Sequence, residues 1–256
     1  MKSDVSSLHP DPRHVVADTT VGEWRHFGSF VKRPRLPAGA ASIGWPSLVA
    51  IGRMWVLDVL LMSALIALAM LVVAFGLDLP ESALGKLEWN AQTIALIVVF
   101  APVSEELLFR SWLSGRIGHW IALGVLGLGL VAVTSLSEAS ISGAALWGFA
   151  LLVLTIGAAG FIGFRVGKRE PVGWFAKLFP VFFWLATLAF ALVHLVNYDE
   201  GSLAYLLPFV IPQFIGGAIF GYVRVHYGLW ASMLIHALHN ATALSVAMLA
   251  GELAGG

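Results

Sequence analysis

The 256-residue chain contains no cysteine, and only 12% of its residues are charged. The absence of cysteine excludes disulfide bonds, a thiol nucleophile and thiolate metal ligands. Soluble domains carry about 25% charged residues, so this chain has too little charge to cover a globular surface. The formal net charge of zero gives no indication of a nucleic-acid partner, because such a partner requires a basic surface.

Hydrophobic residues make up 59% of the chain, and the mean hydropathy of +0.86 indicates that lipid is their solvent. Only helices fit long apolar runs, because an unpaired backbone is not tolerated in lipid. We predict an all-α integral membrane protein, a bundle of seven or eight transmembrane helices. Seven runs are close to the ~20 residues that cross a bilayer core: 54–75, 91–113, 121–136, 142–164, 180–198, 203–223 and 229–250.

The distribution of basic residues supports seven spans. With the N-terminus inside, 14 of the 15 Lys and Arg residues fall in inner segments, and only Lys86 falls outside. A wrong number of spans would scramble this alternation, so the positive-inside rule predicts a cytoplasmic N-terminus and an outer C-terminus. We expect the protein to lie in a bacterial plasma membrane.

Residues 1–46 contain five prolines and scattered charges, a composition typical of disordered segments. We interpret them as a mostly disordered cytoplasmic arm and residues 47–256 as the transmembrane domain. The basic sequence at 32–35 either lies on an anionic lipid surface or is solvated without a role, and both interpretations stay open.

The second apolar run contains two adjacent carboxylates, Glu105 and Glu106. A charge at the centre of a membrane helix costs at least ~2.5–3.5 kcal/mol. Glu106 and Arg110 are four residues apart with the acid first, the favourable arrangement for an ion pair within a helix. Adjacent residues point about 100° apart on a helix, so Glu105 lacks this partner. We predict that Glu106 and Arg110 neutralise each other, whereas Glu105 is free for chemistry.

Histidines lie in the fifth and seventh runs. Phe190 precedes His194 by one helical turn and shares its face. His236 and Asn240 are also four residues apart, and His239 lies close to the same face. Three polar groups on one stripe of an apolar helix indicate a site lining a cavity, although polar helix packing would give the same pattern.

These polar groups are least costly if they converge in one water-filled pocket. A carboxylate and an imidazole can activate water, and His and Asn can donate hydrogen bonds to an oxyanion. The same histidines could instead bind a divalent metal ion such as zinc, with Glu105, His194 and His236 as the ligands. The apolar runs contain almost no other polar residues. Asp58, in the first run, is the main exception, and we expect it near the inner surface of the membrane.

The three polar segments resemble the motifs of the CAAX prenyl endopeptidase and bacteriocin-processing (CPBP, or Abi) family. The family pattern is Glu-Glu-x-x-x-Arg, then Phe-x-x-x-His, then His-x-x-x-Asn. Each motif falls within a predicted span, in this order: Glu105-Glu106-x-x-x-Arg110, Phe190-x-x-x-His194 and His236-x-x-x-Asn240. The resemblance covers residues 95 to 245.

The resemblance implies an intramembrane endopeptidase that acts on a membrane-associated peptide or protein. By resemblance, Glu105 and His194 activate the attacking water, and His236 and Asn240 stabilise the tetrahedral oxyanion. The chain has no His-Glu-x-x-His zinc helix, so no cofactor is assigned. Four further residues are expected to support the site: Glu106, Arg110, Phe190 and His239.

The depth of the two motifs in the bilayer sets a geometric condition. If the fifth span begins at Pro180, His194 lies about 21 Å into it at ~1.5 Å per residue. Glu105 reaches the same depth only if its helix continues past Arg110 to about Gly118. We therefore predict one continuous helix over 91–118.

Two other functions fit the same residues. A proton- or cation-coupled transporter could use Glu105, His194 and His236 as its path, but transporters commonly contain related halves, and no convincing internal repeat is found. A non-catalytic membrane partner, for example an immunity protein, could retain the motifs for folding.

Overall fold

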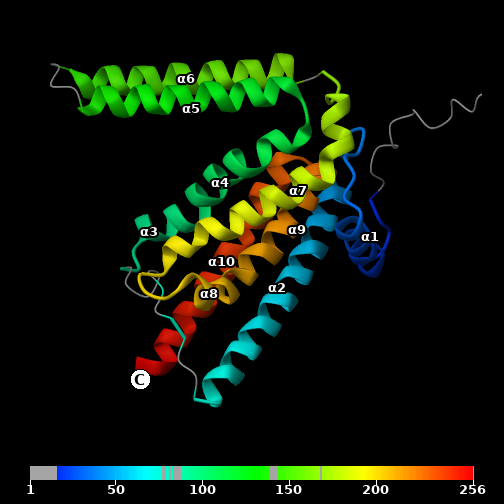
Figure 1. The fold of residues 1–256 in the computed structure, drawn as a ribbon, viewed down its shortest axis with the longest axis vertical. Helices are drawn as coiled ribbons and strands as arrows, with labels where there is room; N and C mark the ends of the chain where they lie inside the picture. The colour runs from blue at the N-terminus through cyan, green and yellow to red at the C-terminus, as the bar shows by residue number, and fades with distance from the viewer. Residues whose placement is uncertain are drawn as a thin grey trace, which may run out of the picture.

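The computed structural model describes residues 16–76, 79–80, 82, 88–138, 143–167 and 169–255. These residues form helices joined by loops, with one isolated bridge between Ser82 and Tyr198 (Figure 1). The prediction of an all-α bundle with seven helical segments long and apolar enough to span a membrane is confirmed for the described residues. The helical segments long and apolar enough to cross a bilayer are Trp45–Ala74, Ala91–Ser114, Ile117–Leu136, Ala144–Val166, Gly173–Asn197, Leu203–Tyr227 and Leu229–Leu249.

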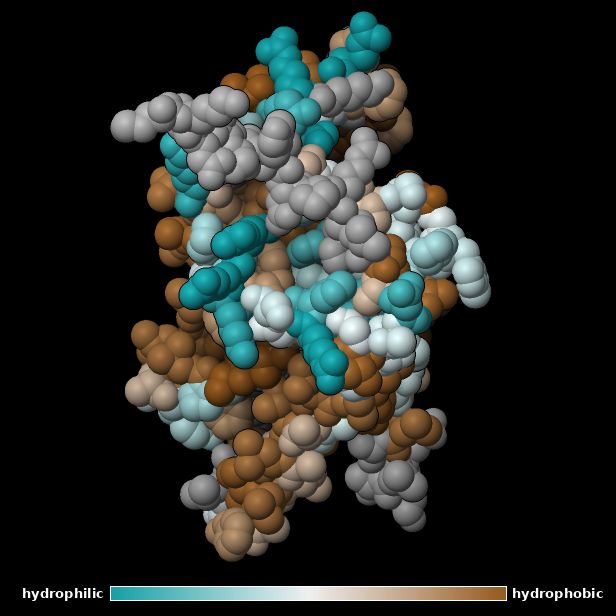
Figure 2. Space-filling model, turned by 90° about the vertical axis from the view of Figure 1, so that its right-hand side faces the viewer, coloured by the Kyte–Doolittle hydropathy of each residue, from teal (hydrophilic) through white to brown (hydrophobic). Residues whose placement is uncertain are grey.

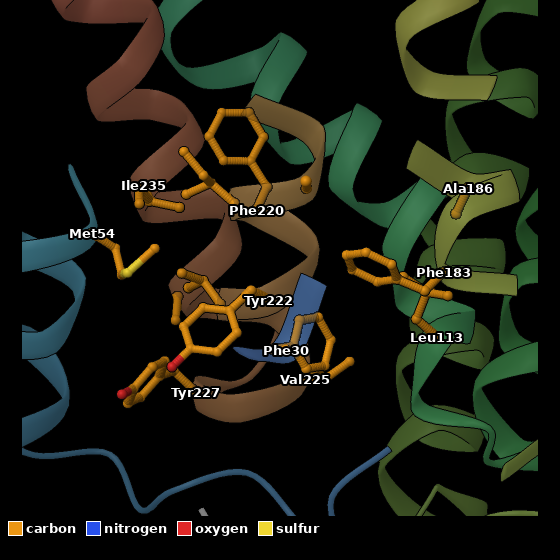
Figure 3. Close-up of a cluster of buried hydrophobic side chains, with 14 of the residues drawn as sticks. Phe30, Met54, Leu113, Phe183, Ala186, Phe220, Tyr222, Val225, Tyr227 and Ile235 are labelled. Atoms are coloured by element: carbon orange, nitrogen blue, oxygen red, sulfur yellow. The ribbon is translucent and has the colours of Figure 1, made fainter. Parts of the chain in front are cut away.

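Helix α9 (Ile211–Tyr227) lies at the centre of the bundle, and every residue of its 216–227 segment is buried. It packs against α2 (Trp45–Ala74), α7 (Gly173–Val193) and α10 (Leu229–Gly255). Aromatic side chains fill the space between these helices, as Figure 3 shows around Phe220 and Tyr222. Helices α7 and α10 thus both pack against α9.

The start of the sixth span is irregular. A single turn of α-helix, α8 (Leu203–Leu206), is followed by the 3-10 turn η6 (Leu207–Val210) before α9 begins. Pro208 and Pro212 lie in this region, and proline removes a helical hydrogen bond and clashes with the preceding turn. The irregular geometry is the expected consequence of the two prolines.

The interpretation of residues 1–46 as a mostly disordered arm is wrong for Thr20–Lys32, which form helix α1. The Thr19 side chain caps its N-terminus by accepting a hydrogen bond from the Gly22 amide at 3.0 Å, a favourable capping arrangement. The buried Phe30 ring packs 5.0 Å from that of Phe183. This tertiary packing stabilises a segment whose proline-rich composition suggested disorder. Residues 1–15 of the arm lie outside the described residues.

The buried carboxylate of Glu23 joins α1 to α9. It accepts hydrogen bonds from the hydroxyl groups of Tyr222 and Tyr227 at 2.7 and 2.6 Å. Helix α1 is therefore part of the folded domain.

In Figure 2, hydrophilic side chains group at mid-height, where Figure 1 places α1, and hydrophobic side chains predominate below them.

The predicted continuous helix over 91–118 is also wrong. The chain forms α3 (Ala91–Ala95), the π-helical turn η3 (Leu96–Phe100), α4 (Ala101–Arg110) and the 3-10 turn η4 (Ser111–Ser114). Arg224 donates hydrogen bonds to the carbonyl oxygens of Arg110 and Ser111 at 2.9 and 3.1 Å. A cation at the C-terminal carbonyls stabilises a helix end, and Gly115, with φ of 66°, turns the chain away.

Helices α5 (Ile117–Glu138) and α6 (Ala144–Val166) form a hairpin that runs across the end of the bundle (Figure 1). Gly129 faces Thr155 so closely that a side chain at Gly129 would overlap it. Small residues permit this close backbone approach between membrane helices. The glycine-rich third span is therefore a packing surface.

Candidate active site

The ion pair predicted within the second span is confirmed. Nη1 of Arg110 lies 2.6 Å from Oε1 of Glu106, and both side chains are fully buried. The Arg110 guanidinium lies over the ring of Phe190, 3.8 Å from its centroid. Removing one partner of a buried ion pair leaves an uncompensated charge, so Glu106 stabilises Arg110 in this position. Arg110 in turn joins α4 to α7 through its contact with Phe190.

Glycine at position 217 provides the space for this packing. A Cβ atom at Gly217 would lie 3.0 Å from Cδ1 of Phe190 and 3.2 Å from Nη2 of Arg110. Because α9 has no side chain at this point, the guanidinium and the phenyl ring can both contact its backbone. A larger residue at position 217 would therefore push the Arg110 and Phe190 side chains away from α9.

His194 and His236 each use the ring nitrogen Nδ1 for a hydrogen bond within the protein. Nδ1 of His194 donates to the carbonyl oxygen of Phe190 at 2.7 Å, and Nδ1 of His236 donates to Oε1 of Glu106 at 3.0 Å. A carbonyl oxygen only accepts, as does an ionised carboxylate, so each bond places the ring hydrogen on Nδ1. Nε2 of each neutral ring is therefore an acceptor.

Both Nε2 atoms face the same carboxylate. Oε2 of Glu105 lies 3.9 Å from Nε2 of His194 and 3.8 Å from Nε2 of His236. The Glu105 side chain is 28% exposed, although its Oε2 atom is buried and has no hydrogen-bond partner in the described part of the chain. The structure thus brings Glu105, His194 and His236 together and directs their reactive atoms at one point.

Asn240 lies one helical turn beyond His236. Its Nδ2 donates to the carbonyl oxygen of Ile97 at 2.8 Å. Ile97 belongs to the π-helical turn η3, and π-turns disturb the regular backbone hydrogen bonding of a helix. Asn240 therefore joins α10 to the irregular part of the second span and retains one amide hydrogen.

His239, expected to support the site, has a partner that the sequence did not indicate. Nδ1 of His239 lies 2.7 Å from Oδ2 of Asp58, whose side chain is 1% exposed. Asp58 is thus buried against α10, and its expected depth near the inner surface stays a prediction. Asp58 is the only charged residue between Met54 and Gly76, and an isolated charge in an apolar run is itself a sign of function.

The donor set Glu105, His194 and His236 has the chemistry of a zinc site. However, no group of three His, Cys, Asp or Glu side chains in the described ranges is arranged closely enough to hold a metal ion. In this arrangement the three side chains therefore do not fit a metal ion.

A separate open apolar depression lies between η4, α5 and α7. Its walls are mainly aromatic, and it contains none of the candidate site residues. It is lined by Trp112, Trp120, Leu123, Gly124, Trp174, Phe175 and Phe182.

Comparison with known proteins gives one family. No curated protein and no solved structure matches the chain. Residues 146–242 match the family model described as type II CAAX prenyl endopeptidase Rce1-like. The match includes the second and third motifs, whereas Glu105, Glu106 and Arg110 lie before it. It supports a peptidase role and an integral membrane protein. Over residues 146–242, the resemblance to the CAAX prenyl endopeptidase family that the motifs indicate is confirmed.

Proposed function

We propose that the chain is an intramembrane endopeptidase in which Glu105 and His194 activate water for attack on a peptide carbonyl. The main support is the approach of Nε2 of His194 and His236 to Oε2 of Glu105, at 3.9 and 3.8 Å. These distances are too long for direct hydrogen bonds, and they suit a water molecule that contacts both groups.

In the proposed reaction, Glu105 takes one proton from water while the water oxygen attacks the carbonyl carbon. Nε2 of His194 accepts the second hydrogen, because its Nδ1 hydrogen is held by Phe190. His194 thereby orients the water. A well-placed general base contributes about 10²–10⁴-fold to a hydrolysis rate.

The carbonyl oxygen becomes negatively charged, and we assign its stabilisation to His236 and Asn240. Asn240 offers the amide hydrogen that its bond to Ile97 leaves. His236 donates from Nε2 only as imidazolium, since Nδ1 already donates to Glu106. The Glu106 carboxylate stabilises this positive charge, as the buried acid of a catalytic triad does.

The proposed substrate is a membrane-associated peptide or protein. The matched family is described as CAAX prenyl endopeptidase, so a farnesylated CAAX-type peptide is the first probe. Its lipid group would partition into the bilayer and bring the peptide bond to the depth of the membrane-embedded site.

The test uses the full chain in liposomes with the farnesylated peptide, followed by mass spectrometry of the products. The Glu105→Gln variant should lower kcat by about 10²–10⁴ because Gln cannot take the proton. Glu170→Gln is the matched control, because Glu170 is an exposed residue in the loop before α7. It should cleave like the unsubstituted protein. Cleavage that is unchanged in Glu105→Gln would remove the proposal.

Proton flux in the same liposomes distinguishes the transporter alternative. A transporter would show Glu105-dependent flux without peptide cleavage, and a non-catalytic partner would show neither activity. The peptidase proposal requires Glu105-dependent cleavage and no such flux.

A further inference from the structure

A second carboxylate–imidazole pair lies beside the first on α10. Asp58 of α2 contacts Nδ1 of His239 at 2.7 Å, just as Glu106 of α4 contacts Nδ1 of His236 at 3.0 Å. In both pairs the carboxylate holds Nδ1 and leaves Nε2 for another partner. The two pairs therefore have the same construction.

The two carboxylates differ in how their charge is balanced. Glu106 has Arg110 as a cationic partner at 2.6 Å. For Asp58, His239 is the only ion-pair partner among the described residues. An uncompensated buried charge is very costly, so a His239 imidazolium is the group that would balance the Asp58 carboxylate. The geometry of the pair therefore suits a proton donor at His239.

The position of His239 relative to His236 suits a peptide substrate. Their ring centroids are 6.5 Å apart. A tetrahedral intermediate, which accepts one hydrogen bond at its oxygen and another at its sp³ nitrogen, each of about 2.9 Å, bridges a gap of this order. The side chain of His239 is 19% exposed, close to the 18% of His194, so the ring is accessible.

The packing around His239 fixes its ring. Phe220 stacks on His236 with centroids 4.5 Å apart and meets His239 edge-on at 5.5 Å. A Cβ atom at Gly216 would lie 3.9 Å from Cε1 of His239, so the ring also lies against the α9 backbone. Together with Asp58, these contacts hold His239 in one orientation.

We propose that His239 is the acid that protonates the leaving amine, and that Asp58 is its positioning residue. This inference rests on the proposed peptidase function and adds a separate proton donor to it. It also accounts for a charged residue in the first span, which lies outside all three motifs and outside the matched residues.

The proposed cleavage involves two proton transfers and one bond exchange at the carbonyl carbon. Water gives one proton to Glu105 and forms the new carbon–oxygen bond. As the carbon–nitrogen bond breaks, the nitrogen takes the Nε2 proton of the His239 imidazolium. The products are a carboxylic acid and an amine, and the proton held by Glu105 then returns to His239.

The leaving group provides the test. An amine must be protonated to depart, whereas a thiolate departs without a proton. The probes are the farnesylated peptide that the protein cleaves and its analogue with a thioester at the scissile bond. His239→Gln should lower kcat for the amide by about 10²-fold or more with little change in KM. It should lower kcat for the thioester by less than about threefold.

Asp58→Asn should show the same selectivity, because Asn can contact His239 but cannot balance its charge. Thr242→Val is the matched control, since Thr242 accepts a hydrogen bond from Trp55 at 3.2 Å between the same two helices. It should leave the ratio of amide to thioester rates unchanged. Retained thioester cleavage also shows that each variant is folded.

Equal loss of amide and thioester cleavage in His239→Gln would overturn the assignment and indicate a structural role. Unchanged amide cleavage would overturn it as well. Failure of the peptidase proposal looks different, because neither probe would then be cleaved in a Glu105-dependent manner.

Discussion

At the scale of single residues, Glu106 has two roles that use the same oxygen atom. Oε1 lies 2.6 Å from Nη1 of Arg110 and 3.0 Å from Nδ1 of His236. The carboxylate therefore balances a buried guanidinium and also sets which nitrogen of His236 faces Glu105. A substitution at Glu106 affects stability and activity through different partners.

We predict that Glu106→Gln lowers the free energy of unfolding in detergent by about 3–5 kcal/mol, because it leaves the Arg110 charge uncompensated. Denaturant titration followed by circular dichroism measures the change. The Glu106→Gln substitution should also abolish most cleavage, since the neutral amide no longer stabilises a His236 imidazolium.

The double variant Glu106→Leu with Arg110→Met separates the two roles. It should recover most of the stability, because apolar residues of similar volume can replace a buried ion pair, without recovering cleavage. If cleavage returned with stability, orientation of His236 by Glu106 would not matter for activity.

The chemistry at the first motif could be predicted from sequence because the i, i+4 spacing of Glu106 and Arg110 determines their contact on any helix. The approach of Glu105 to His194 and His236 could be expected only from the cost of burying polar groups in lipid. The Asp58–His239 contact could not be predicted, because it depends on how α2 rotates and packs against α10. The bond from Asn240 to Ile97 depends on a π-turn that no residue pattern indicated.

At the scale of elements, α9 leaves room at Gly217 for the direct contact between α4 and α7. Gly217 lets the Arg110 guanidinium and the Phe190 ring contact its backbone. We predict that Gly217→Ala destabilises the protein by about 1–3 kcal/mol through overpacking. It should also lower kcat, by up to about 10²-fold if the site residues are displaced by 1 Å.

Gly160→Ala, in α6, is the control for this substitution, because a Cβ atom there meets no atom within 4 Å. It should leave both cleavage and unfolding unchanged. Equal behaviour of the two alanine variants would show that Arg110 and Phe190 can move aside without consequence.

The α5–α6 hairpin provides a second prediction at this scale. Gly129→Ala should lower the unfolding temperature, because the new methyl group overlaps Thr155. Adding Thr155→Gly should restore it by removing the obstructing side chain. Because the site residues lie on α4, α10 and the 3-10 turn η5 (His194–Asn197) that follows α7, kcat of the folded fraction should stay the same. A lower kcat would instead indicate that the hairpin positions the site.

The prediction of one helix over 91–118 was wrong for reasons at the scale of elements. The fifth span begins before Pro180, because α7 begins at Gly173 and contains Pro180 inside the helix. The second span is not a regular helix, because it includes a π-turn and a 3-10 turn. The convergence of Glu105 and His194 therefore does not require a helix that continues to Gly118.

At the scale of the whole molecule, many large hydrophobic side chains are exposed on the surface. Large hydrophobic side chains such as Leu128, Trp147 and Leu154 are 75%, 61% and 69% exposed on α5 and α6. In a bilayer such exposure is favourable, so the limited burial inside the bundle does not indicate instability. Stability must come from close packing and buried polar contacts, since lipid provides no hydrophobic driving force between helices.

The charges of the chain predict the orientation of the bundle in the membrane. This orientation can be measured directly, because the chain contains no cysteine. Glu170 and Glu200 are exposed and lie at opposite ends of the fifth span. The positive-inside rule places Glu170 with the inner basic residues and Glu200 outside. In intact cells, a membrane-impermeant maleimide should therefore label Glu200→Cys but not Glu170→Cys.

Both single-cysteine variants should be labelled once the cells are permeabilised, which controls for accessibility. The two substitutions are chemically identical, so any difference in intact cells reports which side of the membrane each position occupies. The reverse labelling pattern would place the N-terminus outside and invert the whole bundle. Labelling of both positions in intact cells would mean that the fifth helical segment does not cross the membrane.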